Sequence, residues 1–182
     1  TPSNNDVSGG GLDTTPPILI LNGSAIINVP IGSDFNDPGT TVSDDNDDNV
    51  IVTVNGAVDV SRLGSYIITY TAIDDSGNSS NVSRTVNMID NASPIITLVG
   101  SASITIDLNT SYTDMGAVAT DNYDNSVNII TSGSVDTSNP GIYEITYTAT
   151  DSSGNIASIK RTITVVNNIK PEPNLKNETN KA

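Results

Sequence analysis

The chain has 182 residues and a net charge of −14, from 21 acidic and 7 basic side chains. Such a charge repels polyanions, which excludes nucleic acids and anionic membrane surfaces as partners. Because there is no histidine and no cysteine, the chain lacks the commonest general base, the usual partner of a nucleophilic serine and the preferred ligands of zinc, so we expect no enzymatic activity. The longest apolar runs, such as Ala25–Pro30, are too short to insert into a bilayer.

The chain begins with a polar segment, residues 1–12, whose Ser, Asn and Gly have almost nothing to bury, so we expect a flexible leader. From Asp13 on, short runs rich in Val, Ile and Thr alternate with clusters of Gly, Asn, Asp and Pro. This pattern predicts strands, at Ile18–Leu21, Ala25–Ile31, Val50–Val54 and Val82–Ile89. Another strand begins at Tyr66, and its apolar residues mark one buried face: Tyr66, Ile68, Tyr70 and Ala72.

The same pattern returns after 77 residues without a gap. Pro17 falls on Pro94, and the stretch that begins at Gly64 matches the stretch that begins at Gly141. We therefore expect two domains, over residues 13–90 and 91–167. The second domain repeats the inward set as Tyr143, Ile145, Tyr147 and Ala149. Residues 168–182 are expected to be a disordered tail or the start of a linker.

Short strands without intervening helices favour a β-sandwich, and the Gly-x-Tyr-x-Ile-x-Tyr-x-Ala pattern favours the immunoglobulin-like kind. In that fold a tyrosine near the start of the penultimate strand closes a corner, and a disulfide cysteine follows two residues later. Ile68 and Ile145 hold the cysteine position here, so we expect the sheets to be joined by apolar packing only. The predicted fold class is all-β, two tandem immunoglobulin-like β-sandwich domains.

One basic residue in each repeat, Arg84 or Arg161, lies in the inward-facing register of its strand. A charge in that position needs a partner. The repeat-matched candidates are Asp37 and Asp114. The alternative is that each arginine reaches water at the edge of the sandwich.

Three motifs together resemble a known family: Asp-x-x-Pro-Pro-Ile from Asp13, the run Phe35–Gly39, and the tyrosine pattern that ends in Ser-Gly-Asn at Asn78. They look like the bacterial Ig-like domain of a pesticidal crystal protein, and hyalin-repeat domains are similar too. The second repeat departs from the pattern at Ser93 and Met115, where prolines are replaced. The resemblance implies a repeated extracellular module of adhesins, surface lipoproteins and secreted enzymes, without a catalytic role of its own.

Aspartates gather in three loops that the immunoglobulin strand order brings to one pole of each sandwich. Clustered carboxylates repel one another unless a cation lies between them, and oxygen ligands select calcium over zinc. We therefore hypothesise calcium sites made of Asp13, Asp44, Asp47 and Asp74, and of Asp90, Asp121, Asp124 and Asp151. An ion beside Asp90 would also stiffen the junction of the repeats. The alternative is that these side chains only cap turns.

The sequence thus predicts a non-catalytic spacer or adhesion segment of a bacterial surface or secreted protein, located outside the cell or on its surface. We expect a monomeric segment of a larger multidomain chain, whose partner is a cell-surface protein or glycan. The alternative is a carbohydrate-binding accessory module of a larger secreted enzyme. Tyr123, in an exposed loop, could then stack on a sugar ring.

Overall fold

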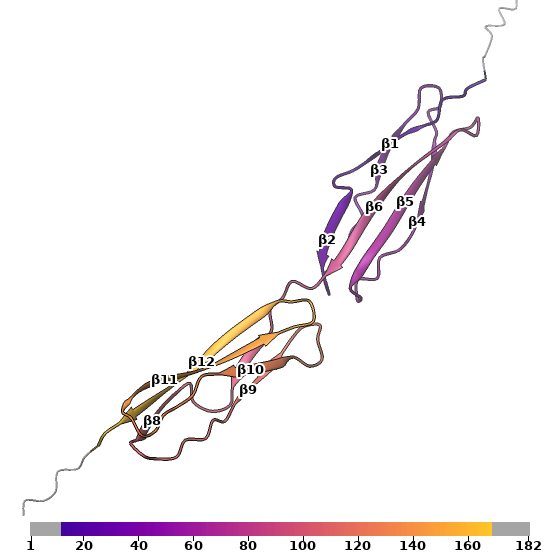
Figure 1. The fold of residues 1–182 in the computed structure, drawn as a ribbon. Coiled ribbons are helices and arrows are strands. Elements are labelled where there is room, and N and C mark those ends of the chain that lie inside the picture. Colours follow the sequence, from indigo (N-terminus) through magenta and orange to yellow (C-terminus); the bar gives the residue numbers. More distant parts are fainter. Residues whose placement is uncertain (1–11, 169–182) are drawn as a thin grey trace, which may run out of the picture. The chain divides into compact units, whose positions relative to one another are not determined.

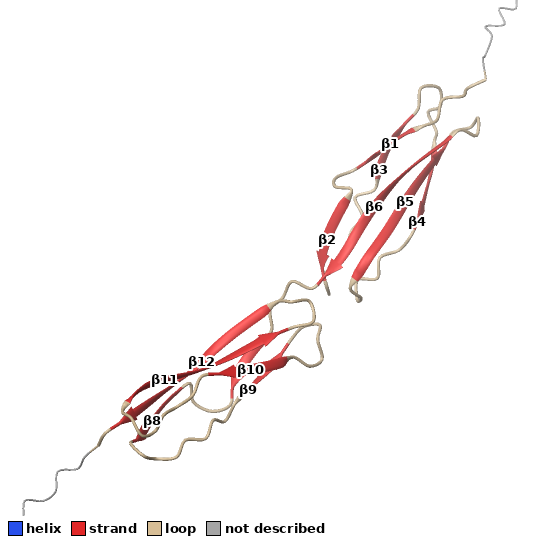
Figure 2. Ribbon diagram, viewed as in Figure 1, coloured by secondary structure: helices blue, strands red, loops and turns tan. Residues whose placement is uncertain are grey.

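A computed structural model describes residues 12–168, and within them the chain forms strands and loops without any helix (Figure 1, Figure 2). It divides into two compact units, one ending at Asp90 and the other beginning at Asn91. The expected leader and tail lie outside the described residues, apart from Leu12 and Asn168. The all-β, tandem immunoglobulin-like fold class is confirmed.

Each unit contains six strands in the same order. Those of the first unit are β1 (Ile18–Leu21), β2 (Ile26–Pro30), β3 (Thr40–Ser43), β4 (Ile51–Asn55), β5 (Gly64–Ile73) and β6 (Ser79–Ile89). Those of the second unit are β7 (Ile95–Leu98), β8 (Ser103–Asp107), β9 (Ala117–Thr120), β10 (Asn128–Ser132), β11 (Gly141–Thr150) and β12 (Ile156–Val166).

The strands of the first unit form a two-stranded sheet, β1-β3, and a four-stranded sheet in the order β2-β6-β5-β4. All pairs are antiparallel except β2 and β6, which run parallel with Ile26 opposite Thr85 and Pro30 opposite Ile89. The second unit repeats this arrangement as β7-β9 and β8-β12-β11-β10, with β8 parallel to β12. The long β5-β6 and β11-β12 hairpins are therefore the centre of each unit.

The core confirms the side-chain directions predicted from alternation. Tyr70 is 1 % exposed and Tyr147 is 0 % exposed, and Leu19 and Leu21 of the two-stranded sheet pack on the cluster that contains Tyr70. The tyrosine corner also forms, because the Tyr66 hydroxyl donates to the carbonyl of Arg62 at 3.0 Å. In the second unit, Tyr143 donates to Asn139 at 2.9 Å.

One strand of each unit was not among the predicted runs: β3, and its counterpart β9. Each has four residues, which is near the lower limit of strand length. Val42 is the only large apolar residue of β3, so the strand shows no alternation of apolar and polar residues that would predict it. The strand forms because it pairs with β1, with Leu19 opposite Val42.

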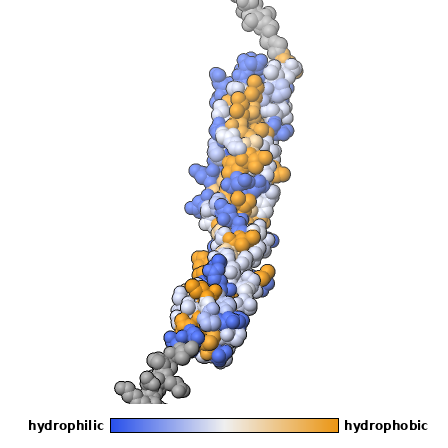
Figure 3. Space-filling model, turned by 60° about the vertical axis from the view of Figure 1, so that its left-hand side comes forward, coloured by the Kyte–Doolittle hydropathy of each residue, from blue (hydrophilic) through white to orange (hydrophobic). Residues whose placement is uncertain are grey.

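Hydrophilic and hydrophobic residues are mixed on the face of the molecule that Figure 3 shows. On the four-stranded sheet of the first unit, Ile51 lies opposite Ile73, and the two are 66 % and 43 % exposed. Further along the same sheet, the hydroxyls of Thr69 and Ser83 lie 3.0 Å apart and form a hydrogen bond. The cores match between repeats, whereas the outer face does not, because Glu144 stands at the position of Ile67.

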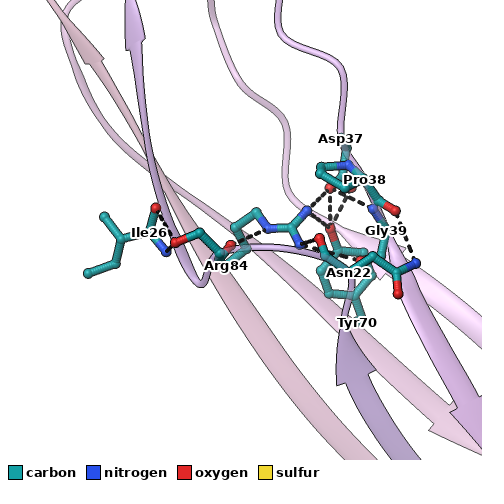
Figure 4. A network of polar contacts seen from close by, with 8 residues as sticks. Asn22, Ile26, Asp37, Pro38, Gly39, Tyr70 and Arg84 are labelled. Atoms are coloured by element: carbon teal, nitrogen blue, oxygen red, sulfur yellow. Dashed lines mark hydrogen bonds and ion pairs between the residues drawn. The ribbon is translucent and has the colours of Figure 1, made fainter.

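A buried polar network joins the two sheets of each unit, which corrects the expectation of apolar packing only. Arg84, on β6, is 0 % exposed, and its Nη1 donates to Asp37 Oδ1 at 2.5 Å (Figure 4). The Tyr70 hydroxyl donates to the same carboxylate. Asp37 belongs to the loop between β2 and β3, so the ion pair bridges the sheets. Arg84 lies opposite Ile68, the residue at the disulfide cysteine position of antibody domains.

The rest of the Arg84 guanidinium is satisfied by backbone carbonyls. Nε donates to Ser24 at 3.0 Å, and Nη2 donates to Asn22 at 2.6 Å. Arg161 repeats the pattern with Asp114, Ser101 and Val99. Of the two readings of these arginines, the ion pair is therefore confirmed, and the water-exposed alternative is wrong. A buried guanidinium needs this full set of acceptors because an unsatisfied charge would be strongly destabilising.

Candidate cation-binding sites

Three loops of the first unit bring their aspartates together at one pole. Asp13 precedes β1, Asp44 follows β3, and Asp74 follows β5. One carboxylate oxygen of each lies within 4.8 Å of the others. The strand order places them there, because β1, β3 and β5 all have the relevant end at this pole of the sandwich.

Each carboxylate uses one oxygen to hold its own loop. Asp13 Oδ1 accepts from the Thr15 amide at 2.9 Å, and Asp44 Oδ1 accepts from the Asn46 and Asp47 amides at 3.0 Å. These are the turn-capping bonds of the alternative reading. The second oxygens, Asp13 Oδ2 and Asp44 Oδ2, are buried and have no hydrogen-bond partner. Turn capping therefore explains only half of the hydrogen-bonding capacity of these two side chains.

Asp74 is the most buried member of the group, at 5 % exposed. Its Oδ1 accepts from the Asn78 amide at 2.7 Å, and its Oδ2 accepts from Asn78 Nδ2 at 2.9 Å. Burial raises the pKa of Asp74, but the hydrogen bonds from Asn78, Gly77 and Ser76 outweigh it, so the pKa is lowered. The carboxylate is held ionised, as a cation ligand must be.

Asp47 does not belong to this group of three, although the sequence suggested it. Its Oδ2 accepts from the Asp75 amide at 3.1 Å, so it ties its loop to the β5-β6 hairpin. That hydrogen bond lowers the pKa of Asp47. Burial and the charges of Asp75, Asp44 and Asp74 together raise the pKa by more, so the net shift is upward. Part of this rise in pKa comes from the neighbouring aspartates, whose negative charges disfavour the ionised form of Asp47.

The second repeat has a matching group, in which one oxygen each of Asp90, Asp121 and Asp151 lies within 4.8 Å of the others. Asp121 Oδ1 accepts from the amides of Tyr123 and Asp124, while its Oδ2 is buried without a hydrogen-bond partner. Asp124 again stays outside, because it accepts from the Ser152 amide at 2.6 Å. Six of the eight suggested ligands thus converge in two groups of three.

Sequence reasoning missed the asparagines that organise these groups. Asn78 holds both oxygens of Asp74 and also donates from Nδ2 to the Asp13 carbonyl at 3.2 Å. Asn155 holds both oxygens of Asp151 in the same way. The signal was present, since Ser-Gly-Asn ends the hairpin turn in both repeats. Its meaning was hidden because a hairpin turn alone also explains it.

A pocket of about 360 Å³ lies along the Asp44 loop, lined by Val42, Ser43, Asp44, Asp47, Asp48, Asn49 and Val50. Five of the seven lining residues are polar, and three of these five are aspartates. Chemically, such a pole can hold a hard cation with oxygen ligands.

The two repeats match a known family. A profile for "Bacterial surface protein, Ig-like domain" matches residues 19–88 and again residues 96–165. The chain belongs to the bacterial surface Ig-like domain family. The family is one of Ig-like modules of bacterial surface proteins. The profile covers β1 to β6 and β7 to β12 almost completely, so the predicted tandem of Ig-like repeats is confirmed.

Curated relatives include hyalin from the sea urchins Strongylocentrotus purpuratus and Lytechinus variegatus, at 34 % and 32 % identity, each over 85 % of this chain. An uncharacterised 81.3 kDa protein of Acholeplasma phage L2 is 28 % identical over 71 % of the chain. The chain spans 14 % and 32 % of the two hyalins and 18 % of the phage protein. The predicted similarity to hyalin repeats is confirmed.

Similar solved structures include a lipoprotein from Bacteroides thetaiotaomicron, at 21 % identity and a TM-score of 0.38, covering 82 % of this chain and 80 % of that one. Drosophila N-cadherin is 16 % identical with a TM-score of 0.38, covering 84 % of this chain and 50 % of that one.

Two further features bear on the alternatives weighed from the sequence. Within residues 12–168, no helix is long and apolar enough to cross a membrane. Across the same residues, Tyr123 is the one aromatic side chain that is well exposed, at 37 %. The described faces therefore carry no row of exposed aromatic rings.

Proposed function

We propose that the chain is a spacer or adhesion segment of a bacterial surface or secreted protein, in which each repeat binds one calcium ion at its group of three aspartates. The observation that carries the calcium site is the pair of buried oxygens, Asp13 Oδ2 and Asp44 Oδ2, that have no hydrogen-bond partner. They belong to two of the three carboxylates that converge within 4.8 Å. A buried, ionised oxygen without a donor is costly, and a cation would satisfy it.

The ligand chemistry favours calcium among the common cations. All side-chain donors are oxygens, which disfavours zinc. Three loops can adjust their spacing to the irregular six to eight ligands of Ca²⁺ more easily than to the strict octahedron of Mg²⁺. The protein ligands in the first repeat would be Asp13, Asp44 and Asp74. Those in the second repeat would be Asp90, Asp121 and Asp151.

The adhesion partner would be a cell-surface protein or glycan, bound by an exported, multidomain parent protein. The membership of the bacterial surface Ig-like domain family supports a role outside the cell. The finer likeness to the Ig-like domain of a pesticidal crystal protein and the stiffening of the junction by calcium stay predictions. Neither is needed for the calcium sites themselves.

Thermal unfolding with and without calcium tests this function. At a free calcium concentration about 100 times the dissociation constant, binding should add about 2.7 kcal/mol of stability to each repeat. For a domain of this size that raises the melting temperature by about 10 °C or more relative to a chelator. Mg²⁺ at the same concentration should give a smaller rise.

The matched variants are neighbours in one loop. Asp44→Asn removes a ligand and should abolish the calcium shift of the first repeat, whereas Asp45→Asn, an exposed aspartate outside the group, should leave it unchanged. A wild-type melting temperature that is the same in calcium and in chelator would reject the calcium sites. The surface role would remain, since it depends on the family and not on the ion.

A further inference from the structure

The second strand and the last strand of each unit, β2 and β6 or β8 and β12, run parallel to each other. In the first unit the chain enters β2 at Ile26 and leaves β6 at Ile89, and these residues lie at opposite ends of the ladder. The ladder continues beyond both strand ends, from the Thr85 amide to the Ala25 carbonyl at 2.8 Å and from the Ile31 amide to Ile89 at 2.7 Å. The second unit has the same two closing bonds, at 2.9 Å each.

This topology decides how the unit responds to tension along the chain. A pull on the two ends draws β2 one way and β6 the other way along their common axis. The evenly spaced hydrogen bonds of a parallel pair are then loaded together and must fail together. If the same strands were pulled apart from one end, the bonds would break one after another, and each would resist alone.

The buried arginine strengthens the same junction. Arg84 lies on β6 directly before Thr85, and it bonds the carbonyls of Asn22 and Ser24, which lie in the connection between β1 and β2. It also bonds Gly39 and Asp37 beside β3. Even if the short β1 detached first, tension arriving at β2 would still have to break bonds to a fully buried guanidinium. Arg161 holds the Val99 and Ser101 carbonyls in the second unit.

We propose that each repeat is a load-bearing element, in which the parallel β2-β6 or β8-β12 ladder and its buried arginine form a clamp against tension along the chain. The inference rests on the proposed role as a surface spacer, which is where such tension arises. It does not depend on calcium. The force reaches each unit through the polypeptide chain on either side of it.

Single-molecule force spectroscopy with two pulling directions tests the clamp. The chain has no cysteine, so engineered cysteines give unique handles. Thr15 and Asn91 are exposed and lie on the two sides of the first unit, while exposed Ser33 lies just after β2. In the full chain, the Thr15→Cys, Asn91→Cys pair loads the ladder in shear. The Ser33→Cys, Asn91→Cys pair opens it from one end.

At equal loading rates and in chelator, the shear pair should unfold at a several-fold higher force than the opening pair. Arg84→Met should lower the shear force markedly and should lower the opening force no more than Ile68→Ala does. Ile68→Ala, in the core of β5, shows how far lost stability alone lowers the force. Equal forces in the two directions would overturn the proposal, and so would an Arg84→Met effect no larger than that of Ile68→Ala. Because the forces are measured in chelator, neither of these outcomes would bear on the proposed calcium sites.

Discussion

Arg84→Met is expected to lower the unfolding free energy of the first repeat by about 3–5 kcal/mol. Methionine fills a similar volume, so the loss comes from the polar groups that remain. Asp37, with 28 % of its side chain exposed, keeps its charge without its partner. The carbonyls of Asn22 and Ser24 lose their donors, and each unsatisfied group adds to the cost.

The matched control is the ion pair between Lys160 and Glu144, whose side chains are 57 % and 51 % exposed. Lys160→Met should cost about 1 kcal/mol or less, because water replaces the lost contact. Amide hydrogen exchange in urea resolves the effect by repeat, with β5 reporting the first and β11 the second. Adding Asp37→Leu to Arg84→Met should recover part of the loss. If Arg84→Met behaved like Lys160→Met, the buried network would not join the sheets.

The second large effect is a loss of stability in strong alkali. Burial, the hydrogen bond to Asp37 and the Asp37 charge raise the pKa of Tyr70 to about 12, against an opposing effect of Arg84. Burial, with Asp114, raises the pKa of Tyr147 to about 12. A tyrosine of the unfolded chain ionises near its ordinary value of about 10. Between these values the unfolded chain has released a proton that the folded chain keeps, so rising pH favours unfolding.

The stability that each tyrosine contributes is complete below about pH 10 and decreases by about 3 kcal/mol by about pH 12. Urea unfolding measured across this range should therefore show a steep fall. Tyr70→Phe should be less stable than the wild type at neutral pH, because Asp37 loses a donor, yet should have a shallower alkaline slope for the first repeat. An unchanged slope in Tyr70→Phe and Tyr147→Phe would contradict the assignment of the raised pKa values.

Local patterns were enough to predict the fold. The alternation around Tyr70 and Tyr147 gives the buried face directly, since side chains of a strand point in turn to opposite sides. Because the same inward-facing positions recur 77 residues later, the second repeat supports the assignment made in the first. β3 escaped prediction because Thr40–Ser43 has too few apolar residues to alternate, and its pairing with β1 is decided by tertiary packing.

The candidate site was predictable to the level of loops and not of atoms. Strand order alone brings Asp13, Asp44 and Asp74 to one pole. Whether a given carboxylate faces the group or a neighbouring amide depends on loop geometry, which spacing does not reveal. Asp47 and Asp124 turned to the hairpin amides for this reason. In the same way, the sequence suggested a partner for Arg84, but not the backbone carbonyls that complete its shell.

Calorimetric titration of the chain with Ca²⁺, after removal of metal by a chelator, tests the central claim most directly. Two calcium ions should bind per chain. Asp44→Asn and Asp121→Asn should each leave one, the double variant should bind none, and Asp45→Asn should still bind two. No heat of binding, or the same stoichiometry in all four variants, would show that the aspartates only cap turns.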